Sequence, residues 1–95
     1  MTRGGLRTPA DNMYQLLRDG NIKEFNAKKA TGDTADLKGC DFRNVDLRGV
    51  DFRNCRMEGA SINAAKVSGA YFPRELSAAE IELSLLHGTR LRYGH

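Results

Sequence analysis

Few side chains in this sequence could do chemistry, and their spacing forms no catalytic arrangement. The two histidines, His87 and His95, lie near the end of the chain, far from the two cysteines, Cys40 and Cys55. The cysteines have no CxxC motif and no histidine nearby, so their spacing does not match a zinc site. We interpret both as buried small hydrophobic residues in preference to a disulfide or a metal-binding pair.

Four aspartates recur at intervals of five residues: Asp36, Asp41, Asp46 and Asp51. Paired carboxylates can bind a metal ion or act as acid and base, but we expect these to point outward on different sides of the fold. His87 is expected at a helix end, where it interacts with the negative end of the helix dipole rather than acting as a base. The sequence therefore predicts no catalytic residue, no metal site, no cofactor and no enzymatic activity.

The aspartates belong to a five-residue repeat that runs through eight pentads, from residue 35 to residue 74. The first place of each pentad holds a small or medium apolar residue, and the fifth place is mostly Gly or Asn. The third place always holds a large apolar residue, and we expect these eight to form the structural core: Leu37, Phe42, Leu47, Phe52, Met57, Ile62, Val67 and Phe72.

A period of five residues fits neither an ordinary helix nor a straight strand. Five residues rotate a helix by about 500°, so successive core residues would scatter around it. On a straight strand an odd period sends them to alternate faces. Because Gly and Asn tolerate the backbone angles of turns, the chain is expected to turn between pentads. The pattern thus predicts a solenoid of very short extended segments.

Pentads with apolar first and third places and Asp in the second resemble the pentapeptide repeat proteins. In that family four pentads form one square turn. The resemblance implies an all-β solenoid with flanking helices: a right-handed quadrilateral β-helix of about two coils over residues 35–74, an N-terminal helical hairpin cap and a C-terminal capping helix. In the second coil the second place of each pentad departs from the family pattern, because it holds Arg56, Ser61, Lys66 or Tyr71 instead of Asp.

The length of one turn decides which residues lie over each other. A turn of twenty residues places Asp36 over Arg56, and a turn of fifteen places Asp41 over Arg56. Both arrangements bring opposite charges together, so charge does not choose between them. The family resemblance implies the twenty-residue turn, with Leu37 over Met57.

Residues 1–34 are predicted to be a mobile arm over residues 1–7 followed by the N-terminal helical cap. We expect Thr8 to cap a first helix and Pro9 to occupy its first position. Asn21 is expected to cap a second short helix.

Residues 75–95 are predicted to be the C-terminal helix and tail, and the whole chain to be one structural domain. Ser77 and Glu80 are expected to form a capping box, with the helix ending at Gly88. These flanks also resemble small free-standing bacterial pentapeptide repeat proteins, which implies that the chain is a complete protein.

Composition indicates a soluble chain. Charged residues make up 28% of the sequence, and the formal net charge is +3. No apolar run reaches the length of a membrane span, and the N-terminus lacks the apolar stretch of a signal peptide. We therefore expect a cytoplasmic protein with no membrane partner, and we see no small-molecule substrate.

These features favour a structural or protein–protein interaction module, possible as a homodimer through the C-terminal helix. The expected partner interface comprises Leu83, Leu86, Leu91 and Tyr93. The alternative is a role with nucleic acid. In one form the chain would bind DNA weakly through its basic N-terminal region, with Arg18, Lys23, Lys28 and Lys29. The other form, a DNA mimic that inhibits topoisomerase, is disfavoured because such a mimic should be long and acidic.

Overall fold

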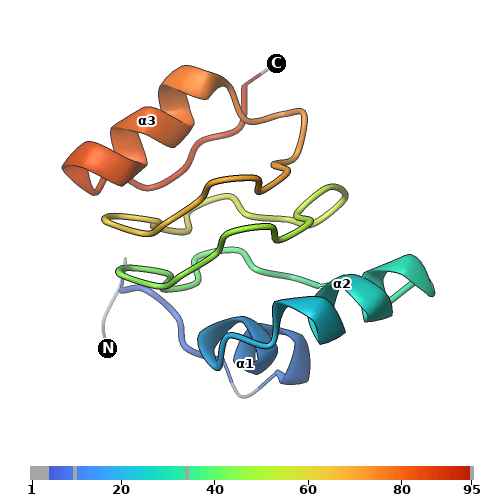
Figure 1. The fold of residues 1–95 in the computed structure, drawn as a ribbon. Helices are drawn as coiled ribbons and strands as arrows, with labels where there is room; N and C mark the ends of the chain where they lie inside the picture. The colour runs from blue at the N-terminus through green and yellow to red at the C-terminus, as the bar shows by residue number, and fades with distance from the viewer. Residues whose placement is uncertain (1–4, 10, 34, 95) are drawn as a thin grey trace.

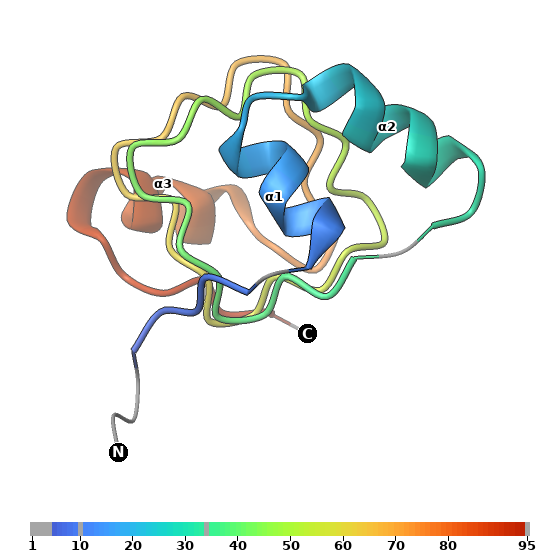
Figure 2. The same cartoon turned by 90° about the horizontal axis from the view of Figure 1, so that it is seen from below.

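The computed structural model describes residues 5–9, 11–33 and 35–94. Its regular elements are three helices: α1 (Asn12–Arg18), α2 (Ile22–Ala30) and α3 (Ala78–His87). Between α2 and α3 the chain winds as a stack of turns, with α1 and α2 at one end and α3 at the other (Figure 1). Seen along the stack, the turns superimpose as one angular outline, across which α1 lies (Figure 2). We call residues 35–72 the repeat coil.

The predicted all-β fold class is wrong, and the described residues contain no β-strand and no sheet. Successive turns of the repeat coil meet only at isolated parallel bridges, one in each pentad of the first turn. The reason is the backbone at the fifth place of the first seven pentads, where φ is positive, as at Asn44 (65°) and Gly49 (80°). Each such residue turns the chain after a single paired residue, so no segment extends far enough to form a strand, and the predicted β-helix is not present.

The bridges nevertheless confirm that one turn contains twenty residues. They pair Asp36 with Arg56, Asp41 with Ser61, Asp46 with Lys66 and Asp51 with Tyr71. Backbone hydrogen bonds follow the same register on every side of the coil; the Leu47 amide, for example, donates to the Lys66 carbonyl at 2.8 Å. The fifteen-residue alternative is therefore excluded.

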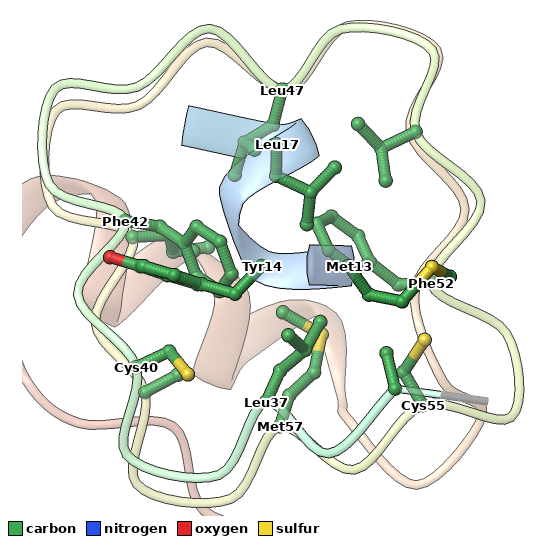
Figure 3. Close-up of a cluster of buried hydrophobic side chains, with 14 of the residues drawn as sticks. Met13, Tyr14, Leu17, Leu37, Cys40, Phe42, Leu47, Phe52, Cys55 and Met57 are labelled. Atoms are coloured by element: carbon green, nitrogen blue, oxygen red, sulfur yellow. The ribbon is translucent and has the colours of Figure 1, made fainter. Parts of the chain in front are cut away.

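The interior of the coil is filled by the third places of the pentads, whose side chains point toward a common axis (Figure 3). Six of the eight predicted core residues are at most 1% exposed: Leu37, Phe42, Leu47, Phe52, Met57 and Ile62. Val67 and Phe72, near the end of the coil, are partly buried against them. The aromatic rings form a continuous contact, with Phe52 stacked on Phe72 at 5.5 Å between centroids. Both cysteines are free and buried in this interior.

Helix α1 closes the first end of the coil with its apolar side. Tyr14 and Leu17 are fully buried, and the Tyr14 hydroxyl donates to the Asp41 carbonyl at 2.7 Å. The helix begins later than predicted: its cap is Asp11, whose carboxylate accepts from the Met13 and Tyr14 amides, and not Thr8. Ala10, within the predicted cap segment, lies outside the described residues.

Two segments from the flanks extend one side of the stack, because their backbones form hydrogen bonds with the coil. The Arg7 amide donates to the Gly39 carbonyl, and the Asp41 amide donates to the Arg7 carbonyl at 2.9 Å. At the other end of the stack, Leu91 pairs in the same way with residues 59 and 60 of the second turn. Arg7 is thus held by backbone hydrogen bonds to the coil and is not part of a mobile arm. Residues 1–4 of the predicted arm lie outside the described residues.

The C-terminal helix α3 has the boundaries that its sequence predicts. The Ser77 hydroxyl accepts from the Glu80 amide at 3.1 Å, and the helix ends at Gly88, which has a left-handed φ of 75°. Glu80 does not complete the capping box: its carboxylate accepts instead from the Arg92 backbone amide and side chain. Among the described residues, no helix has the length and apolar character needed to cross a membrane.

Candidate functional site

Side chains close the two ends of the repeat coil by imitating the hydrogen bonds of a further turn. On the first turn, the Asn26 amide of α2 donates to the Gly49 carbonyl at 3.0 Å and accepts from the Asp51 amide at 2.9 Å. On the second turn, the Tyr93 hydroxyl accepts from the Met57 amide and donates to the Cys55 carbonyl. A primary amide and a hydroxyl both carry a donor and an acceptor, so each can take the place of the backbone N–H and C=O groups that a further turn would offer.

Helix α3 closes another side of the second turn in a similar way. The buried Ser84 hydroxyl accepts from the Ile62 amide at 3.1 Å. The Ala64 amide donates to the Leu85 carbonyl, and the Asn63 side chain donates to the same carbonyl. These contacts occupy backbone groups that an additional turn would otherwise pair with.

The surface of the first turn carries three ion pairs of identical geometry. In each, an Asp in the second place of a pentad accepts two hydrogen bonds from the Arg two residues later: Asp41–Arg43, Asp46–Arg48 and Asp51–Arg53. Asp46 and Arg48 meet through paired contacts of 2.9 and 2.7 Å. The bridges do place Asp46 beside Lys66 of the next turn, but its ion pair forms within its own pentad.

The arginines make these aspartates stronger acids. Hydrogen bonds from the Arg48 side chain and backbone lower the pKa of Asp46 to about 2. The Arg43 and Arg53 guanidinium groups likewise lower the pKa of Asp41 and that of Asp51. Each carboxylate also accepts from a backbone amide and so braces its turn. The arrangement is typical of paired surface charges that hold backbone corners, not of an acid–base pair.

The outer side of α3 exposes two large apolar side chains, Leu83 (38% exposed) and Leu86 (65% exposed). The opposite side of the helix, with Ile81 and Leu85, packs against the core. The predicted interface also included Leu91 and Tyr93, but these two do not lie on the outer side of the helix with the exposed leucines. Leu91 is 1% exposed and Tyr93 is half-buried. Both form hydrogen bonds with the second turn of the coil, which leaves Leu83 and Leu86 as the candidate surface.

A second candidate is a cleft of about 630 Å³ between the end of α2 and the corner of the coil at residues 53–56. Its walls carry the cations Lys29, Arg53, Arg56 and Arg74, the carboxylates Asp51 and Glu75, and the rings of Phe72 and Tyr93. The cleft could not be predicted from the sequence, because its lining residues come from four separate segments. Only the stacking of the turns brings them together.

The residues that could serve chemistry remain scattered. In the described part of the chain, no group of three or more His, Cys, Asp or Glu side chains could hold a metal ion. Burial raises the pKa of the Cys40 thiol to about 11. His87 is the last residue of α3, and His95 lies outside the described residues.

Two of the basic residues assigned to the nucleic-acid alternative make contacts within the protomer. Arg18 donates to the Asp41 carbonyl, and Lys29 donates to the Arg53 carbonyl. Lys23 is exposed and Lys28 is half-buried, both on α2. Binding of DNA by this region is untested and stays a prediction.

Comparison with known proteins identifies the repeat. Residues 35–72 match the family model described as Pentapeptide repeats, in eight copies. The match covers the repeat coil and leaves out the three helices. No curated protein and no solved structure matched the chain.

Proposed function

Residues 35–72 belong to the pentapeptide repeat family, and from this premise we propose that the chain is a non-enzymatic interaction module that pairs with a second copy of itself through α3. Pentapeptide repeats suggest a structural or interaction role. The observation that carries the finer proposal is the outer side of α3, where Leu83 and Leu86 are exposed while Ile81 and Leu85 pack against the core.

The contacts that close the two ends of the coil favour a partner that packs on α3 over a partner that adds a further turn to the coil. Asn26 and α1 cover the first end, and Tyr93 and Ser84 pair with backbone of the second. A partner that adds a turn would have to displace these contacts. A partner that packs on the outer side of α3 would leave these contacts in place and would cover Leu83 and Leu86, whose burial is favourable.

A second copy fits this surface because a two-fold dimer needs only one patch that complements itself. Leu83 and Leu86 are three residues apart and lie along one side of the helix. Two such helices crossing about a two-fold axis would bury the same leucines from both protomers. The coils would then project away from the interface on opposite sides (Figure 1).

The proposal is tested by light scattering coupled to gel filtration over a hundredfold range of concentration. We expect the mass of the natural protein to rise toward that of a dimer, and the double variant Leu83→Glu, Leu86→Glu to stay monomeric with an unchanged circular dichroism spectrum. The control is Tyr71→Glu, which places a single glutamate at another large exposed side chain, 57% exposed on the coil. A natural protein that stays monomeric at the highest concentration would overturn the proposal.

We also propose a cytoplasmic location. It is supported by the two cysteines, which are free and buried within an otherwise ordinary apolar core. Free thiols are typical of proteins in a reducing compartment. Fractionation of the host cell with an antibody against the chain would test the location.

A further inference from the structure

We propose that the cleft beside the end of α2 binds a small phosphorylated molecule with a planar ring, of the nucleoside diphosphate type. Nothing in the proposed pairing through α3 requires this site. The cleft has a volume of about 630 Å³, within the usual range of about 300–1,000 Å³ for small-molecule sites.

The charge of the lining favours an anion. Four cations less two carboxylates leave a formal charge of +2 on the walls. Two of the cations are already engaged with carboxylates, since Arg53 pairs with Asp51 at 3.0 Å and Arg56 pairs with Glu58 at 2.9 Å. Within the described residues neither Arg74 nor Lys29 forms an ion pair. Lys29 donates one hydrogen bond to the Arg53 carbonyl, and its ammonium has further donors. These two side chains are therefore the cations of the cleft that no carboxylate neutralises.

Phosphate suits these two cations better than a single carboxylate does. A terminal phosphate presents three oxygens, so it can accept two parallel hydrogen bonds from the guanidinium of Arg74 and a further one from the ammonium of Lys29. Arg74 is exposed, which lets it turn toward a ligand, and Lys29 is half-buried at the end of α2.

The rest of the lining favours a flat group attached to the phosphate. Phe72 and Tyr93 are both half-buried, and Cys55, which also lines the cleft, is 4% exposed. Phe72 is held in place because it stacks on Phe52 at an interplanar angle of 23°. Tyr93 is held by its two hydrogen bonds to the coil. Fixed aromatic walls lose little entropy when a planar ring packs against them.

The test is titration calorimetry of the full chain with ADP, adenosine and pyrophosphate at low and moderate salt. We expect ADP to bind more tightly than either of the others, because adenosine lacks the phosphates and pyrophosphate lacks the ring. The affinity for ADP should fall as salt rises. Adenosine or pyrophosphate binding as tightly as ADP would overturn the proposal, as would the absence of saturable binding of ADP.

Charge variants sharpen the test. Arg74→Gln should weaken ADP binding about tenfold, the cost of losing one charged hydrogen-bonding partner. Glu75→Gln should strengthen it about twofold, because a carboxylate on the same wall repels the phosphates. The matched control is Lys23→Gln, an exposed cation at the other end of α2. Equal effects of Arg74→Gln and Lys23→Gln would show that only overall charge matters and would contradict the proposed site; dichroism spectra confirm that each variant is folded.

Discussion

Replacing Asn26 by alanine tests whether a side-chain amide closes the first turn of the coil. The amide group makes two hydrogen bonds, at 3.0 Å to the Gly49 carbonyl and at 2.9 Å from the Asp51 amide. Each is expected to contribute about 0.5–1.5 kcal/mol to the free energy of unfolding, so losing both costs about 1–3 kcal/mol. Alanine is the better helix former inside α2 and returns about 0.6 kcal/mol. The net loss is therefore about 0.5–2.5 kcal/mol.

This loss should be measurable as a lower midpoint of thermal unfolding. For a domain of this size 1 kcal/mol corresponds to about 4–8 °C, so Asn26→Ala should unfold roughly 2–20 °C below the natural protein. Urea unfolding followed by circular dichroism gives the free energy directly. The expected value rests on both partners being backbone groups of the coil, of which the Asp51 amide is partly shielded from water.

The control is the same substitution at the start of the same helix. Asn21 is the N-terminal cap residue of α2, but its side chain makes no capping hydrogen bond. Asn21→Ala should therefore change the free energy of unfolding by no more than about 0.5 kcal/mol. If Asn26→Ala lowers the free energy of unfolding no more than Asn21→Ala does, the Asn26 amide does not stabilise the first turn and the reasoning is refuted.

Three further predictions concern the coil. Ala64 has a φ of 62°, so Ala64→Gly should raise the free energy of unfolding by about 1 kcal/mol. Ala79 in α3 is also exposed, and Ala79→Gly should lower the free energy of unfolding by about 1 kcal/mol. A loss of stability at both positions in urea unfolding would contradict the strained backbone at Ala64. Because the pKa of Asp46 lies near 2 in the folded protein and near 3.9 in an unfolded chain, its contribution to stability is present above about pH 4 and is lost as the pH falls toward 2. An NMR titration of its carboxyl carbon should show this low midpoint, and the midpoint should rise in Arg48→Gln; no change in that variant would contradict the cause. The Cys40 thiol, with a pKa of about 11, should react with a disulfide reagent at pH 8 only as fast as the protein unfolds, and rapid reaction under native conditions would contradict its burial.

The interior of the coil could be predicted from the sequence because it follows from one local rule. Each pentad has the same large apolar place, so six core residues from Leu37 to Ile62 follow from the period alone. The length of a turn did not follow from the residues, because opposite charges met at both fifteen and twenty residues. It came from the family resemblance, and the bridge between Asp36 and Arg56 agrees with it.

The error in fold class has a physical origin in the fifth place of each pentad. The resemblance implied a β-helix, and the apolar pattern was correctly assigned to the interior. However, a positive φ at residues such as Asn54 (67°) interrupts pairing after each bridge. The turns stack without forming strands, so the only regular elements in the described residues are helices.

The closing contacts and the cleft could not be predicted because they depend on where distant segments meet. Asn26 is an ordinary residue of α2 until the Gly49 carbonyl is placed beside it. Leu91 and Tyr93 look like spare apolar residues after a helix, yet their backbone and hydroxyl groups complete the second turn. No local pattern distinguishes such residues from those that face a partner.

The most direct test of the account is to measure which amide donates to which carbonyl across the coil. Every surface discussed above follows from the twenty-residue turn, including the side on which α3 exposes its leucines and the corner that forms the cleft. NMR couplings through hydrogen bonds in isotopically labelled protein should connect the Leu47 amide with the Lys66 carbonyl and the Phe52 amide with the Tyr71 carbonyl. Couplings from these amides to residues of a fifteen-residue register, or rapid exchange of both amides with solvent, would contradict the account.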